Sequence, residues 1–105
     1  YCADGKCAIV WVTLDMLNRL NIGEDEIEGL ASIPRQIEGV LIGITMKEKE
    51  GGFFKISVRT NGNIDAAKFC SRFGGGGHKA AAGCSINGSL EDVRSQLIKA
   101  AEETL

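Results

Sequence analysis

One short segment carries the residues of this sequence that are best suited to chemistry. It consists of Gly74, Gly75, Gly76, Gly77, His78 and Lys79. Glycine has no Cβ, so such a run lets the main chain approach a ligand closely and point several N–H groups at one anion. His78 and Lys79 can add hydrogen bonds and positive charge, and Arg59 can add a bidentate contact from a nearby strand. These residue types predict a phosphate-binding site.

The glycine-rich segment lies in the basic part of an acidic chain. The formal net charge is −2 at pH 7 and the pI is about 5.4. Residues 55–79 hold five bases and one acid, which is +4, and the remainder of the chain carries −6. A protein that coats duplex nucleic acid non-specifically usually has a broad basic face, which this composition disfavours. The charge pattern favours a local anion site.

Simpler interpretations of the same residues stay open at this point. The run follows a predicted helix, so it is not a Rossmann fingerprint, and no Gly-Lys-Ser/Thr closes it as in a Walker A loop. Four glycines alone suit a flexible turn after a helix equally well. Taken singly, His78 is typical of a structural or surface histidine and Arg59 of a solvated strand face. Their proximity to the glycines favours the binding interpretation.

The sequence offers no metal site and no catalytic residue. Its four cysteines are Cys2, Cys7, Cys70 and Cys84. They form no C-x-x-C pair, and their spacing to His78 matches no structural zinc motif. Nothing indicates secretion, so we interpret the cysteines as small buried thiols and expect no disulfides.

Hydrophobic patterning predicts four strands. They cover residues 8–14, 40–46, 53–60 and 80–86. The first two are continuous apolar runs, which is typical of strands covered on both faces. The third alternates, with Phe54, Ile56 and Val58 on one face and polar residues, including Arg59, on the other. The polar turn at residues 48–52 predicts a hairpin.

Helix signals separate and follow these strands. Asp15 begins a short predicted helix that ends before Gly23, and acidic residues 24–26 begin another. Asp65 is a candidate N-cap for a helix that Gly74 would end. Ser89 begins a terminal helix with a capping-box pattern. We therefore predict an α+β fold in which helices pack on a mixed sheet of about four to five strands.

Length and terminal residues suggest how the chain is organised. The 105 residues fit one domain, and no apolar stretch approaches the roughly 20 residues of a membrane helix. Residues 1–6 do not resemble a signal peptide, so we expect a cytoplasmic protein with no membrane partner. The chain begins at Tyr1 and lacks an initiator Met, which is typical of a domain cut from a longer polypeptide.

Three segments of the sequence resemble a known family. They are residues 56–60 (ISVRT), residues 64–67 (IDAA) and residues 73–83 (FGGGGHKAAAG). Together they resemble the DHH-associated domain that ends nanoRNase and RecJ-like phosphoesterases. The similarity runs from about Ile22 to Leu105, and the Gly-Gly-Gly-His element is its most specific part. The chain is thus identified as the C-terminal, substrate-binding part of a two-domain protein.

The resemblance implies a division of labour. An N-terminal DHH domain would hold manganese and perform hydrolysis, while this domain would bind short RNA or a nucleotide phosphate such as 3′-phosphoadenosine 5′-phosphate. Carried onto this sequence, the family pattern assigns phosphate contacts to Gly75, Gly76, Gly77 and His78, and a phosphate or nucleotide contact to Arg59. No cofactor would be bound by this chain itself, and a homodimer stays open.

Two other functions stay open as well. Alanyl-tRNA synthetases carry a related C-terminal glycine-rich domain, so a tRNA-binding module is the second interpretation, although the acidic body disfavours it. A third is a regulatory module whose glycine loop binds a nucleotide as a signal.

We predict that the chain by itself does not hydrolyse nucleotides, because two-metal hydrolysis needs several grouped carboxylate and imidazole ligands. Incubation with Mn²⁺ and a labelled RNA dinucleotide should release no mononucleotide above a buffer control. Robust metal-dependent turnover by a pure preparation would overturn the interpretation of this chain as a binding domain.

Overall fold

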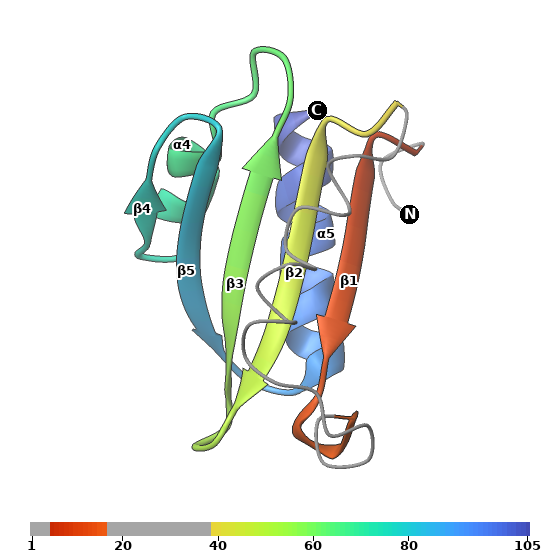
Figure 1. The fold of residues 1–105 in the computed structure, drawn as a ribbon, viewed down its shortest axis with the longest axis vertical. Helices are drawn as coiled ribbons and strands as arrows, with labels where there is room; N and C mark the ends of the chain where they lie inside the picture. Colours follow the sequence, from red (N-terminus) through yellow and green to blue (C-terminus); the bar gives the residue numbers. More distant parts are fainter. Residues whose placement is uncertain (1–4, 17–38) are drawn as a thin grey trace.

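The computed structural model describes residues 5–16 and 39–105, and their strands form one five-stranded mixed sheet (Figure 1). The strands are β1 (Cys7–Val12), β2 (Ile42–Lys49), β3 (Phe53–Thr60), β4 (Gly76–Gly77) and β5 (Ala81–Asn87). Their spatial order is β1-β2-β3-β5-β4. β1 runs parallel to β2, and every other neighbouring pair is antiparallel.

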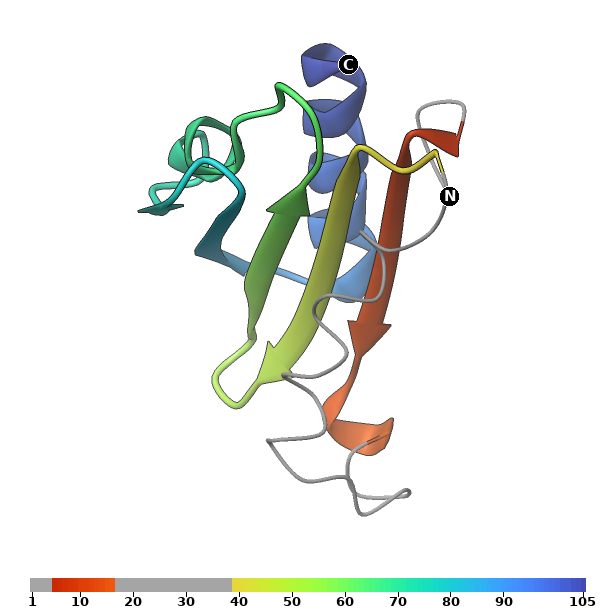
Figure 2. The same cartoon turned by 45° about the horizontal axis from the view of Figure 1, so that its top comes forward.

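Two helices cover one face of this sheet. Helix α4 (Ala66–Ser71) lies behind β5, and helix α5 (Leu90–Thr104) lies behind the central strands (Figures 1 and 2). The inward residues of β3, Phe54, Ile56 and Val58, are at most 2% exposed and pack into one core with Leu97 and Phe69 of the helices. The helices therefore cover one face of the sheet. We call the opposite side of β3, β5 and β4 the open face, whereas on that side of β2 Thr45 and Lys47 are buried.

Both helices begin at the caps that the sequence predicts. Asp65 accepts a hydrogen bond from the Lys68 N–H at 3.1 Å, and Ser89 accepts one from the Asp92 N–H at 3.2 Å. The helical segment stops at Gly74 as predicted: α4 spans Ala66–Ser71, and Gly74 then takes a positive φ of +79°. The Gly74 N–H donates to the Ser71 carbonyl and the Gly75 N–H to the Cys70 carbonyl, which is the usual pattern of a glycine at a helix C-terminus. From Arg72 to Gly74 the main chain changes to i→i+3 hydrogen bonds, which tighten the last turn.

The glycine run forms the strand β4, which the sequence pattern did not predict. β4 lies at the edge of the sheet and pairs with β5, with Gly76 opposite Gly83 and Gly77 opposite Ala82. A Cβ on Gly75 would lie 2.5 Å from the Cys84 Cβ and would also collide with the Gly83 carbonyl oxygen. A Cβ on Gly77 would lie 2.6 Å from the Ala82 Cα. Two of the glycines are therefore needed for close packing against β5.

The α+β fold is confirmed. β3 has its predicted bounds, and the ends of β1, β2 and β5 are shifted by one to three residues from the predicted ones. Cys70 and Cys84 are free and buried, as expected, and Cys7 is also buried, whereas Cys2 lies outside the described residues. The helices predicted between Asp15 and Gly39 fall largely on residues 17–38, which are also outside the described part. Across residues 5–16 and 39–105, no helix has the length and apolar character needed to cross a bilayer.

We predict opposite outcomes for two neighbouring glycine substitutions. Gly75→Ala should destabilise the fold by about 1 to 3 kcal/mol, because its methyl group has no room beside β5. Gly76→Ala should leave stability unchanged or raise it by up to about 1 kcal/mol, since nothing lies within 4 Å of that Cβ position and its φ is not positive. Urea unfolding of both variants measures the difference, and equal losses of stability would contradict the packing described here.

Candidate functional site

The strand register brings Arg59 and His78 to the same face of the sheet. Arg59 pairs with Ala81 across β3 and β5. The His78 N–H donates to the Ala81 carbonyl at 2.7 Å, and the Ala81 N–H donates back at 3.3 Å, so these two residues also stand opposite each other. Directly opposed residues of an antiparallel pair point to the same side. Arg59 and His78 therefore flank Ala81 on the open face, with their Cα atoms two strands, or about 10 Å, apart.

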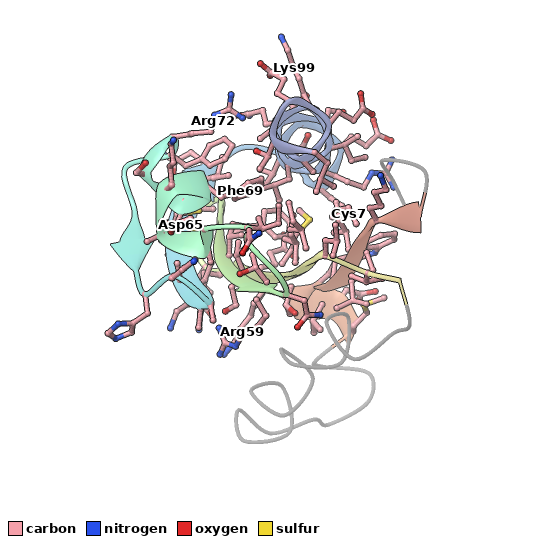
Figure 3. The ribbon with its side chains drawn as sticks, turned by 90° about the horizontal axis from the view of Figure 1, so that it is seen from above. Cys7, Arg59, Asp65, Phe69, Arg72 and Lys99 are labelled. Atoms are coloured by element: carbon pink, nitrogen blue, oxygen red, sulfur yellow. The ribbon has the colours of Figure 1, made fainter. Side chains whose placement is uncertain are left out.

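Arg59 points away from the helices (Figure 3). Its guanidinium makes one weak contact within the described residues, from Nη1 to the Val58 carbonyl at 3.5 Å. His78 is exposed. Both side chains are thus available to a ligand on the open face.

A second row of residues gives this site a floor without bulky side chains. Ser57 pairs with Gly83 on β5, and Gly83 pairs with Gly76 on β4, so the three share the open face. Between Arg59 and His78, the surface therefore consists of Ala81, Gly83 and Gly76. A ligand held by the two basic residues can rest almost directly on the main chain.

The main chain of the glycine run is largely occupied by internal hydrogen bonds, which corrects the expectation of several N–H groups aimed at one anion. The N–H groups of Gly74, Gly75 and His78 donate to the carbonyls of Ser71, Cys70 and Ala81. Hydrogen-bonded and non-hydrogen-bonded pairs alternate along an antiparallel ladder. Because His78 and Ala81 exchange both bonds, Gly77 belongs to a non-bonded pair, and its N–H points out from the sheet edge.

Two of the seven predicted site residues lie away from the open face. Gly74 has a φ of +79° and forms the turn between α4 and β4. Lys79 lines a hollow of about 760 Å³ on the helix side, together with Lys68 of α4 and Arg72, which follows that helix. The structure thus brings Arg59, Gly76 and His78 together, while Gly75 and Gly77 pack against β5.

Thr60 holds the segment that follows His78. Its hydroxyl is within hydrogen-bond distance of the Ile64 carbonyl at 2.8 Å and the Lys79 carbonyl at 3.1 Å, and its side chain is buried. The Ala66 N–H also donates to the Lys79 carbonyl, at 2.6 Å. The turn at residues 78–81 is therefore fastened to the end of β3 and the start of α4.

A pair of buried thiols, one from α4 and one from β5, packs against the glycine run. A hydrogen bond between the Cys70 and Cys84 thiols raises the pKa of Cys70, and the burial of Cys70 raises it further. The same hydrogen bond lowers the pKa of Cys84. Gly75 touches both residues, through its N–H to the Cys70 carbonyl and through its close approach to Cys84. These thiols serve as small packing groups between α4 and β5.

Sequence reasoning missed the contribution of β5 to the site. Ala81, Gly83 and Ser85 alternate with the inward residues of this strand, so period-two spacing of small residues was an available signal. The pairing that places them beside Arg59 depends on contacts between residues distant in sequence, which the pattern does not contain.

Within the described ranges, no three His, Cys, Asp or Glu side chains group as metal ligands. The family resemblance implies manganese in a separate N-terminal domain, and no hydrolytic step is assigned to the residues described here.

The chain belongs to the DHHA1 domain family, whose model matches residues 4–105. It is also 29% identical, over 83 residues, to the bifunctional oligoribonuclease and PAP phosphatase NrnA of Thermus thermophilus. That match includes 78% of this chain and 25% of NrnA. The chain therefore spans about a quarter of the length of this relative.

Two solved structures share the fold. An exopolyphosphatase-related protein from Bacteroides fragilis superposes with a TM-score of 0.85 at 24% identity, covering 98% of this chain and 31% of that protein. The C-Ala domain of Aquifex aeolicus alanyl-tRNA synthetase superposes with a TM-score of 0.66 at 16% identity, covering 94% and 89%. At these identities the likeness shows the fold alone.

We predict that Thr60→Val lowers stability by about 1 kcal/mol, because one buried hydrogen-bond donor to the 78–81 turn is lost at nearly constant volume. Thr104→Val is the matched control, since its hydroxyl bonds only the Ala100 carbonyl at the exposed end of α5 and should matter less. Urea unfolding measures both. Equal effects would show that Thr60 does not fasten the turn.

Proposed function

We propose that this chain is the substrate-binding domain of a DHH-family phosphoesterase that acts on short RNA or on nucleotide phosphates such as 3′-phosphoadenosine 5′-phosphate. Membership of the DHHA1 family supports the phosphoesterase class. The similarity to the Thermus thermophilus oligoribonuclease and PAP phosphatase supports the substrate class. A DHH domain with bound manganese would perform the hydrolysis, in the cytoplasm.

Gly76 is the observation that carries this proposal. Its neighbours Gly75 and Gly77 have a packing reason to be glycine, and Gly74 has a positive φ. Gly76 has neither, because its φ is not positive and nothing lies within 4 Å of its Cβ position. A ligand that rests on the main chain between Arg59 and His78 explains why this exposed position carries no side chain.

The flanking side chains suit a phosphate ester. Arg59 keeps its charge at any working pH and can donate two parallel hydrogen bonds to phosphate oxygens. A histidine such as His78 donates from one ring nitrogen when neutral and from both when protonated. The two groups approach from opposite sides of a flat floor, so they can fix the phosphate position and leave the ester bond accessible from above. In this proposal, these residues bind and orient the substrate for a metal centre outside the described residues.

We predict that three substitutions weaken nucleotide binding without unfolding the protein. NMR titration of the chain with 3′-phosphoadenosine 5′-phosphate should shift the amide signals of Gly76, His78 and Ala81. Arg59→Ala and His78→Ala should each lower affinity by about ten- to a hundredfold, the usual effect of losing a hydrogen bond to a charged group. Gly76→Val should block the floor and leave the amide spectrum dispersed.

Lys99→Ala is the matched control, because Lys99 is exposed on α5, on the other side of the sheet from Arg59 (Figure 3). The Lys99→Ala variant should bind 3′-phosphoadenosine 5′-phosphate with the same affinity as the parent. Signal shifts confined to the helix side, around Lys68 and Lys79, would contradict the proposed site. Binding of tRNA but of neither mononucleotide nor dinucleotide would favour the synthetase-type module instead.

A further inference from the structure

The open face continues past Arg59 along β3 and β5, whose outward residues include no acid. We call the residues that β3 and β5 contribute to it the β3–β5 strip: Arg59, Ser57, Lys55, Ala81, Gly83 and Ser85. Lys55 and Ser85 pair with each other and are both exposed. The strip begins at the candidate site and ends near the hairpin between β2 and β3.

The strands on either side of this strip direct no acid toward it. None of the residues that β2, β3 and β5 direct to the open face is acidic, and the residue facing Lys55 from β2 is another lysine, Lys47. The one acid in these three strands, Glu48, pairs with the inward Phe54. Within the described ranges Lys55 makes no salt bridge. A chain with a net charge of −2 thus presents a purely basic strip next to its candidate site.

The spacing of the two basic residues sets the size of the ligand. Lys55 lies four residues from Arg59 along β3, which is about 13 Å between Cα atoms. Strand side chains stand roughly perpendicular to the sheet, so the two heads point upward in parallel and do not converge on one phosphate. A phosphate at Lys55 must therefore be a different one from the phosphate at Arg59. Ser57 stands halfway between them and can donate a hydrogen bond to the connecting backbone.

We propose that Lys55 binds a second, more distant phosphate of the same ligand, so that an oligoribonucleotide of more than two nucleotides lies along the β3–β5 strip. This inference rests on the proposed function and adds the direction in which the nucleotide chain leaves the site. The small residues Ala81 and Gly83 leave room for the ribose-phosphate backbone close to the sheet, as Gly76 does at the site itself.

The test compares a ribodinucleotide with a ribotetranucleotide in binding titrations. The parent should bind the tetranucleotide more tightly. Lys55→Ala should weaken tetranucleotide binding by about three- to fivefold, the scale of an exposed charge contact, and dinucleotide binding by less than twofold. The slope of log affinity against log salt should become shallower by about 0.7 for the tetranucleotide alone, since one phosphate contact is lost. Lys99→Ala should change the affinity for neither ligand.

Three results would overturn the inference. The first is a Lys55→Ala variant equal to the parent, or equally weakened for both lengths. The second is a loss of tetranucleotide affinity in Lys68→Ala and not in Lys55→Ala, which would show that the oligonucleotide binds along the helix side. The third is a parent that binds the dinucleotide through Arg59 and gains nothing from added nucleotides, which leaves the proposed function standing. If the parent binds neither ligand, the proposed function fails as well.

Discussion

The candidate site depends on how closely β4 lies against β5. Two side-chain-free positions, Gly75 and Gly77, allow a contact that any Cβ would prevent. That contact turns the chain at His78 back toward β5 and so sets His78 level with Ala81 and Arg59. If β4 were displaced outward by one side chain, His78 would no longer share a row with Arg59. The glycines therefore act first on the position of the histidine and only then on the space for a ligand.

The two faces of the sheet divide the work. The face under α4 and α5 supplies the core, with Ile44, Ile56 and Val58 fully buried. The open face carries the basic residues of β3, and β3 and β5 direct no acid to it. The exterior of α5 is different, since Glu91 and Asp92 occupy its first turn. Strand alternation makes this separation possible, because every second residue of β3 is released from packing. Of the basic segment of the sequence, Lys55 and Arg59 thus lie on the open face, whereas Lys68, Arg72 and Lys79 lie on the helix side.

Most of the fold could be predicted from local pattern, whereas the assembly of the site could not. Alternation in residues 53–60 and the caps Asp65 and Ser89 predicted β3, α4 and α5, because these signals act between residues close in sequence. Residue type, proximity to the glycine run and the family resemblance predicted Arg59, His78 and Lys79 as ligand contacts, but they could not predict that Lys79 would line a hollow on the helix side. That outcome depends on a turn fastened by Thr60, nineteen residues away in the chain. The sequence also could not predict that most glycine N–H groups form hydrogen bonds within the protein, since this follows from the pairing of β4 with β5.

The length of β4 has a consequence for how the protein behaves in a crowded solution. A sheet edge exposes unpaired main-chain donors and acceptors, and a long, flat edge recruits strands from other molecules. Here the edge beside the candidate site is two residues long, with an outward-facing glycine and a turn at its end. An edge strand of two residues offers too few hydrogen bonds to pair stably with a strand of another molecule. A ligand-binding surface can therefore lie at the edge of the sheet without promoting aggregation through that edge.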